Sequence, residues 1–163
     1  MAILDKLEAA GEKLRGTSKP PVSLTGSDSA CPLEVVVLHT ETRETLDALK
    51  AAANLAQGLD VRIRLLVPQI VPIQLPVDQP DISLGFTRRR FQTLASHSRI
   101  ETLVDIRLGR EKREILASAL KPHSVVVLGG KRPWWPGKVR FMANRLAKMG
   151  HHVVFAEANS RTR

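Results

Sequence analysis

The chain has 163 residues, of which 43% are hydrophobic, so it is long enough for one domain with a buried core and hardly for two. Its net charge is +9, and the part from Lys121 to the C-terminus holds nine basic residues and one acid, Glu157. The lone Cys31 excludes an internal disulfide and a thiolate metal site, and no stretch holds the ~20 apolar residues that a spanning helix needs. Charges near the N-terminus interrupt the apolar part of a secretory signal, so we expect a soluble, cytoplasmic protein.

The first 32 residues fall into two predicted parts. Residues 1–15 have apolar side chains at helical spacing and nearly balanced charges, which predicts an amphipathic helix. This helix could pack on the domain, dock a protein partner or lie on a membrane surface, and the balanced charges favour the first two. Residues 16–32 are rich in Ser, Thr, Pro and Gly and are predicted to be a flexible linker.

Residues 33–158 are predicted to form one α/β domain, with a disordered tail at 159–163. The runs at 34–38 and 124–128 are continuously apolar after their first residue and rich in valine, which is typical of strands buried on both faces. The predicted elements, in chain order, are a strand at 34–38, a helix capped by Thr40 and ended by Gly58, a strand at 61–67, a loop at 68–84, a helix at 85–98, a strand at 100–108, a helix at 110–120, a strand at 124–128, a helix at 138–149 and a strand at 152–156.

The strict alternation of strands and helices predicts a single doubly wound, five-stranded parallel sheet with helices on both faces. Ligands of such sheets bind beyond the carboxyl ends of the strands, where the strand order switches. Three segments should meet there: His39, Thr40 and Thr42 after the first strand, Val67 at the end of the second, and the residues that follow the fourth.

The segment after the fourth strand, residues 129–138, is glycine-bearing and basic. Two glycines let a ligand approach the backbone, and the helix N-terminus that follows favours anions. Its two tryptophans, Trp134 and Trp135, could stack on a base or anchor a protein partner, or could simply cover the end of the sheet. The segment is not a P-loop, because no glycine-lysine-hydroxyl triplet opens the helix.

The order of elements over residues 33–157 resembles that of the universal stress proteins, most clearly from Val104 to Ala156. Nucleotide-binding members of that family carry a glycine, a second glycine three residues on, and a Gly-Ser or Gly-Thr pair ten further. Here Gly130 matches the first position, Pro133 stands at the second and Ala143-Asn144 at the pair, while His39 stands where the family has an aspartate near the adenosine. The resemblance implies an adenine nucleotide as a candidate ligand, and these departures count against it. It also implies a homodimer, often formed through the last strand, here 152–156.

Two sets of candidate residues follow from the sheet edge and the resemblance. The ligand-binding candidates are His39, Thr40, Thr42, Val67, Gly129, Gly130, Lys131, Arg132 and Asn144. The candidates for stacking on a base or for a partner contact are Trp134, Trp135, Lys138 and Arg140.

No catalytic set and no metal site is predicted. The adjacent His151 and His152 open a strand, so they point to opposite faces and cannot share one metal ion. His39 and Glu41 could act as an acid-base pair, but Glu41 is equally explained as a first-turn helix residue. We therefore expect a non-enzymatic stress-response or regulatory module that binds a small ligand or a protein. The alternatives are a nucleic-acid- or ribosome-associated protein, which the basic C-terminal quarter favours, and an adaptor that docks a membrane transporter or kinase through residues 1–15.

Overall fold

The structure is a computed structural model, and it describes residues 33–78, 83–130 and 137–157. Several predictions therefore fall outside the described residues. They concern the helix at 1–15, the linker at 16–32, the tail at 159–163, and the side chains of Lys131, Arg132, Trp134 and Trp135.

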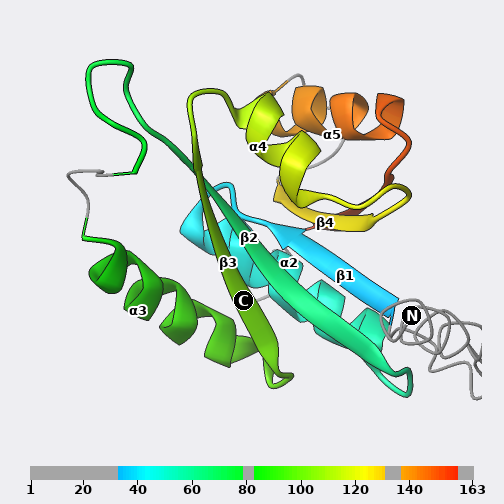
Figure 1. The fold of residues 1–163 in the computed structure, drawn as a ribbon. Coiled ribbons are helices and arrows are strands. Elements are labelled where there is room, and N and C mark those ends of the chain that lie inside the picture. Colours follow the sequence, from blue (N-terminus) through cyan, green and yellow to red (C-terminus); the bar gives the residue numbers. More distant parts are fainter. Residues whose placement is uncertain (1–32, 79–82, 131–136, 158–163) are drawn as a thin grey trace, which may run out of the picture. The chain divides into compact units, whose positions relative to one another are not determined.

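In the described part of the chain, five parallel strands form one sheet in the order β3-β2-β1-β4-β5, of which Figure 1 labels the first four. Their bounds are β1 (Leu33–Leu38), β2 (Val61–Ile70), β3 (Thr102–Gly109), β4 (Val125–Gly130) and β5 (His152–Glu157). The central strand β1 pairs with both neighbours, because Val35 lies opposite Ile63 of β2 and Val125 of β4. This arrangement confirms the predicted five-stranded parallel sheet and places the switch in strand order between β1 and β4.

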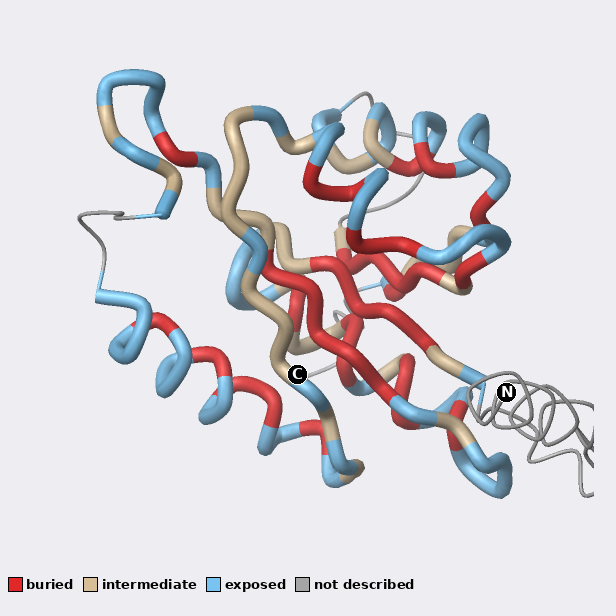
Figure 2. Tube along the Cα trace, in the orientation of Figure 1, coloured by how far each residue is buried: buried red, intermediate tan, exposed pale blue. Residues whose placement is uncertain are grey.

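Helices cover both faces of the sheet, and the side chains of successive strand residues point alternately to the two faces. The helices α2 (Thr42–Ala56) and α3 (Leu84–Ala95) pack over Val35 and Val37, with a short 3-10 turn, η1 (Ser96–Ser98), after α3. The helices α4 (Lys112–Ala119) and α5 (Lys138–Lys148) pack over Val36 and Leu38 on the opposite face. Figure 2 shows β1 buried along most of its length, while each helix exposes its outer side. Each such fully buried Val or Leu contributes roughly 1.5–3 kcal/mol, which explains the unbroken apolar run.

Among these described helices, none combines the length and the apolar character needed to cross a membrane.

The strand β2 is longer than the sequence predicts, because it continues through Pro68 to Ile70. Leu66 accepts a hydrogen bond from His39, so the backbone of Leu66, and of Pro68 two residues on, faces the β1 side. At Pro68 the strand β1 has already ended, and no ladder donor is needed there. A proline is tolerated where its missing N–H is not required, so the predicted loop begins after residue 70 and not at 68.

Candidate functional site

The ends of β1 and β4 come together around the first turn of α2, at the carboxyl edge of the sheet. His39 directly follows β1, and its backbone N–H donates to the carbonyl of Leu66 at 2.9 Å. On β4, a Cβ atom added to Gly129 would lie 1.8 Å from the backbone oxygen of Glu44 in α2. Only glycine lets the helix turn approach β4 this closely. The sequence placed His39 and Gly129 at one edge, and the structure sets both against the same turn of α2.

Hydrogen bonds at His39 fix which ring nitrogen carries the proton. Its Nδ1 lies 2.8 Å from the hydroxyl of Thr45. That hydroxyl donates its one hydrogen to the carbonyl of Glu41 at 2.7 Å, so it accepts from His39. The backbone N–H of Thr40 also donates to it, at 3.4 Å. Nδ1 is therefore protonated in the neutral ring, and Nε2 is left with a lone pair that can accept a hydrogen bond.

The ring of His39 is kept neutral by its surroundings. It meets Phe91 of α3 edge-on, with the ring centroids 4.6 Å apart. Burial, followed by the positive charges of Arg90 and Lys112, lowers the pKa of His39 from 6.5 to about 4. Burial also lowers the pKa of Lys112. The site thus combines a neutral hydrogen-bond acceptor with two nearby cations.

The two threonines predicted here are engaged in holding α2. Thr40 does not cap the helix as expected, because the capping position falls on Glu41, whose side chain makes no cap bond. Instead, the Thr40 hydroxyl donates to the carboxylate of Glu44 at 2.8 Å. The Thr42 hydroxyl accepts a hydrogen bond from the guanidinium of Arg90 at 3.3 Å, which links α2 to α3.

The remaining ligand-binding candidates lie at different depths. Val67 has no exposed surface and belongs to the core under α2 and α3, so its side chain is not available to a ligand. Gly130 is the last residue of β4, and a Cβ added to it would lie 3.3 Å from Val139 of α5. Asn144 is exposed on the second turn of α5, and no described hydrogen bond joins it to His39.

The sequence reasoning missed three residues that complete this edge: Thr45, Arg90 and Lys112. Arg90 is exposed on α3, and its contact with Thr42 depends on how α3 packs beside α2. For Lys112 the sequence does contain a signal. It is the first residue of α4, and a cation is disfavoured at a helix N-terminus, where negative charge is stabilising.

The helix α5 presents a basic outer surface with one large apolar side chain. It has four basic residues and no acid, and Phe141 is 69% exposed among them. The basic residues, all exposed, are Lys138, Arg140, Arg145 and Lys148. Such a surface attracts anions, and an aromatic face can stack on a base.

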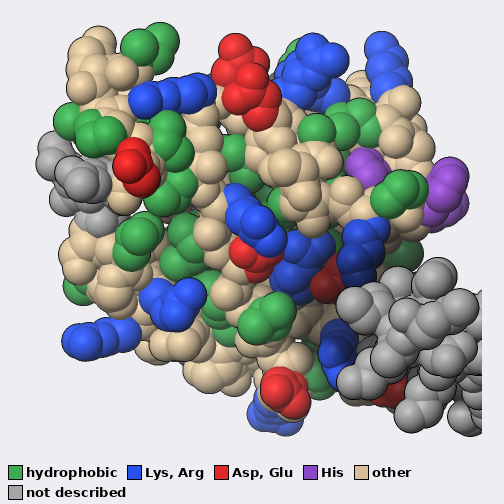
Figure 3. Space-filling view, viewed as in Figure 1, with side chains coloured by type: hydrophobic (Ala, Val, Ile, Leu, Met, Phe, Trp, Pro, Cys, Tyr) green, Lys and Arg blue, Asp and Glu red, His purple; other side chains and the backbone are tan. Residues whose placement is uncertain are grey.

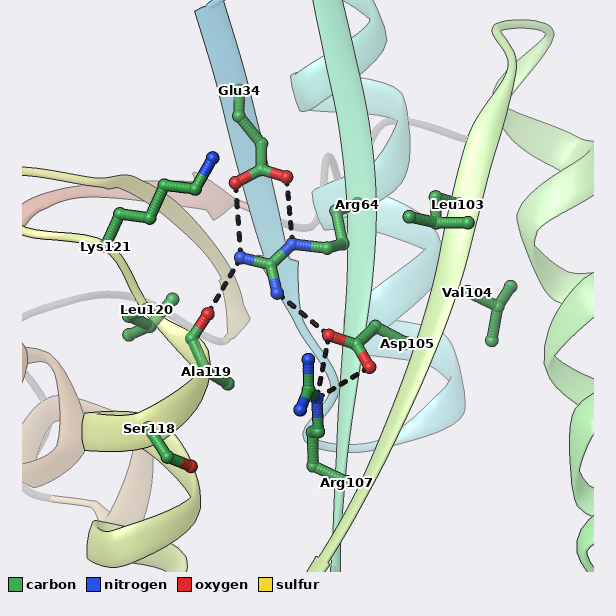
Figure 4. A pocket seen from close by; sticks show the side chains of 10 residues that line it. All are labelled: Glu34, Arg64, Leu103, Val104, Asp105, Arg107, Ser118, Ala119, Leu120 and Lys121. Carbon is green, nitrogen blue, oxygen red and sulfur yellow. Dashed lines mark hydrogen bonds and ion pairs between the residues drawn. The ribbon is translucent and has the colours of Figure 1, made fainter. Parts of the chain in front are cut away.

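A hollow of about 500 Å³ opens beside β3, on the face that α4 and α5 cover (Figure 4). At its base lies Arg64, which is 7% exposed. Its Nη1 donates to Asp105 at 2.9 Å, and its Nη2 donates to Glu34 at 3.2 Å and to the carbonyl of Ala119 at 3.0 Å. Its Nε lies 3.0 Å from Glu34 as an ion pair, at an angle outside hydrogen-bond geometry.

Arg64 is thus committed to the protein, since it ties β1, β2 and β3 to the end of α4. Arg107, half exposed at the rim, donates through its Nε to Asp105 at 2.8 Å. Figure 3 shows basic and acidic side chains side by side over the middle of this face. We read this network as structural, and it was not predicted from the sequence.

The described residues contain no group of three His, Cys, Asp or Glu side chains that could hold a metal ion. His151 is buried and His152 is exposed, as expected for neighbours at the start of a strand. Burial, and to a lesser extent the charge of His123, lowers the pKa of His151.

Comparison with known proteins gives one finding at the level of structure. No protein-family model matches the chain, and a search of curated proteins gives no match. Among solved structures, the chain is similar to a universal stress protein in complex with cAMP. The TM-score is 0.48 and the sequence identity is 15%, and the alignment covers 77% of this chain and 98% of that chain. That protein belongs to the family that the order of elements resembles.

Proposed function

We propose that this chain is a non-enzymatic, cytoplasmic regulatory module of the stress-response type, which binds a small ligand at the carboxyl edge between β1 and β4. The observation that carries this proposal is His39. Its Nδ1 is bonded to Thr45, its ring is neutral, and its Nε2 can accept a hydrogen bond at the carboxyl end of β1, next to the switch in strand order.

The chemistry of the edge favours a ligand with two features. A hydroxyl or amino group of the ligand would donate to Nε2 of His39, and an anionic group would lie near Lys112 and Arg90. Adenine nucleotides have both features, so they are the probes to use first. Cyclic AMP, which the similar solved structure holds, belongs in that panel together with AMP, ADP and ATP.

Isothermal titration calorimetry with this panel tests the proposal, and two variants test the role of Nε2. His39→Asn keeps an amide near the position of Nδ1, where it can still meet Thr45, but removes the acceptor at Nε2. We expect its affinity to fall by about tenfold or more, the worth of one hydrogen bond. His39→Gln places an amide oxygen near the position of Nε2 and should retain part of the affinity.

The matched control is His97→Asn, which changes an exposed histidine of η1. It should bind the ligand like the wild type. If no member of the panel gives heat, or if His39→Asn and His97→Asn bind equally well, the proposed role of this edge is wrong.

A second function is favoured by α5, namely binding of single-stranded nucleic acid. Its exposed basic residues surround Phe141, which offers an exposed ring. Fluorescence anisotropy with labelled RNA should show affinity that falls steeply as salt rises. Arg145→Gln with Lys148→Gln should reduce the salt slope by about 1.4, whereas Arg88→Gln with Arg89→Gln, an exposed pair on α3, should leave it unchanged. Equal slopes for the two double variants would exclude α5 as the contact.

The alternative function, an adaptor that docks a partner through residues 1–15, is tested separately. Deleting residues 1–30 should abolish association with a partner and leave the far-UV circular dichroism of the α/β domain intact. Association that survives the deletion would exclude residues 1–15 as the docking segment.

A further inference from the structure

The strand β3 ends the sheet on one side, and within the described segments no other strand pairs with its outer edge. The backbone directions along it can be read from one hydrogen bond. The carbonyl of Gly109 accepts from Val71, so Gly109 faces β2, as do the residues at every second position before it. The backbone groups of Val104, Ile106 and Leu108 therefore point outward, in the form that another strand can pair with.

We infer that this edge pairs antiparallel with β3 of a second copy, about a twofold axis perpendicular to the sheet that passes midway between the two copies of Ile106. Such an axis keeps the α4 side of one copy on the α4 side of the other. The side chains of two residues that lie opposite each other across the strands must then be on the same face of the sheet. The possible registers therefore differ in steps of two residues. The side chains of β3 decide among these registers.

Like charges exclude the two neighbouring registers. With the axis at Asp105, that carboxylate would face its own copy, and with the axis at Arg107, two guanidiniums would meet. With the axis at Ile106, Asp105 faces the partner's Arg107 and Arg107 faces the partner's Asp105. This register gives two opposite-charge pairs and no like-charge pair along the strand.

The other side chains agree with this register. On the α4 side, Leu103, which is 65% exposed, would lie over the partner's Gly109, which has no side chain to obstruct it. On the α3 side, Val104 would face the partner's Leu108, and Ile106 would face its own copy. All the outward-pointing backbone groups are then opposite one another, as hydrogen-bonded antiparallel pairs require.

Hollows border β3 on both of its faces. The hollow of about 500 Å³ borders it on the α4 side, and a cavity of about 310 Å³, lined by Ile106 and Leu108 together with Leu84, Gly85 and Arg88, borders it on the α3 side. Arg107 is 51% exposed and bonds Asp105 only through Nε, so in the described part of the chain its terminal nitrogens make no hydrogen bond. Those nitrogens are the donors that the second copy would use.

Disulfide cross-linking of the full chain in a Cys31→Ser background tests both the contact and its register. Ile106→Cys places one thiol beside its own copy, at the Cα separation of about 5.5 Å of a hydrogen-bonded pair, which a disulfide can span. Leu103→Cys is more exposed, but the two copies of that residue would be about 20 Å apart along the strands. We expect copper-phenanthroline to yield a covalent dimer from Ile106→Cys and not from Leu103→Cys.

A charge reversal gives an independent measurement without a cysteine. Arg107→Glu sets acids opposite acids at both charge pairs, so analytical ultracentrifugation should show self-association weakened about tenfold or more. Arg140→Glu makes the same charge change on the exposed surface of α5 and should leave association unchanged. A protein that stays monomeric at millimolar concentration overturns the inference. So does a dimer that survives Arg107→Glu, or one that cross-links through residue 103 and not through residue 106.

Discussion

Replacement of Arg64 by methionine should cost this domain a large part of its stability. Methionine keeps the apolar stem of the side chain and removes the guanidinium, so the packing changes little. What is lost is the partner of Glu34, of Asp105 and of the carbonyl of Ala119. Removal of one member of a buried ion pair typically costs about 3–5 kcal/mol, because the other charge is left without a partner.

The structure places the expected loss below that range. The side chains of Glu34 and Asp105 are 28% and 17% exposed, and Asp105 retains its contact with Arg107, so water and one cation still stabilise the remaining charges. We therefore expect Arg64→Met to lower the free energy of unfolding by about 2–3 kcal/mol, which is a large share of the ~5–15 kcal/mol of a typical domain.

Urea denaturation followed by far-UV circular dichroism measures this difference, and β2 supplies the control. Arg62 lies two residues earlier on the same strand and is exposed, so Arg62→Met should change stability by less than about 0.5 kcal/mol. Adding Glu34→Gln to Arg64→Met removes the charge that has lost its partner and should recover about 1 kcal/mol. If Arg64→Met is as stable as Arg62→Met, the network does not stabilise the fold and the reasoning fails.

Two further predictions concern the carboxyl edge. Gly129→Ala should lower stability by about 3 kcal/mol or more in thermal denaturation, because its Cβ would overlap the backbone of Glu44, whereas Gly137→Ala, with open space around it, should change it by less than about 0.5 kcal/mol. Between pH 6.5 and about 4 the unfolded chain takes up a proton at His39 that the folded chain does not, so stability should fall as the pH falls through this window. The fall should be shallower in His39→Asn than in His97→Asn, and identical slopes would contradict the lowered pKa of His39.

The fold was largely predictable because its signals are local. The apolar runs of β1 and β4 report strands buried on both faces, and the alternation of strands with helices leaves few topologies open. The exceptions depend on neighbours that are distant in sequence. Pro68 can lie inside β2 only because β1 ends opposite Leu66, two residues before it. Arg64 is buried only because Glu34 and Asp105, on two other strands, face it.

The candidate site was predictable in position but not in chemistry. His39 and Gly129 follow from the rule that ligands meet the carboxyl ends of strands, and the sequence alone gives that. The protonation state of His39 does not follow from the sequence, because it depends on a hydroxyl of α2 and on cations from α3 and α4. Three segments far apart in the chain must be placed before the ring can be recognised as a neutral acceptor.

The pH dependence of ligand binding separates the two roles that His39 could have. If a ligand donates to Nε2, the neutral ring is the binding form, and it predominates at every pH well above about 4. The affinity of the bound nucleotide should then be constant from pH 8 to pH 5.5 and fall at lower pH, after correction for the ligand's own titration. If the ligand instead pairs with a protonated ring, affinity must rise as the pH is lowered over the same range, because the imidazolium becomes more populated. Calorimetric titrations at several pH values, with His39→Gln as the variant that cannot titrate, decide between them. An affinity that rises toward acid in the wild type and stays flat in His39→Gln would show that His39 acts as a cation and would refute the neutral acceptor derived from Thr45 and Glu41.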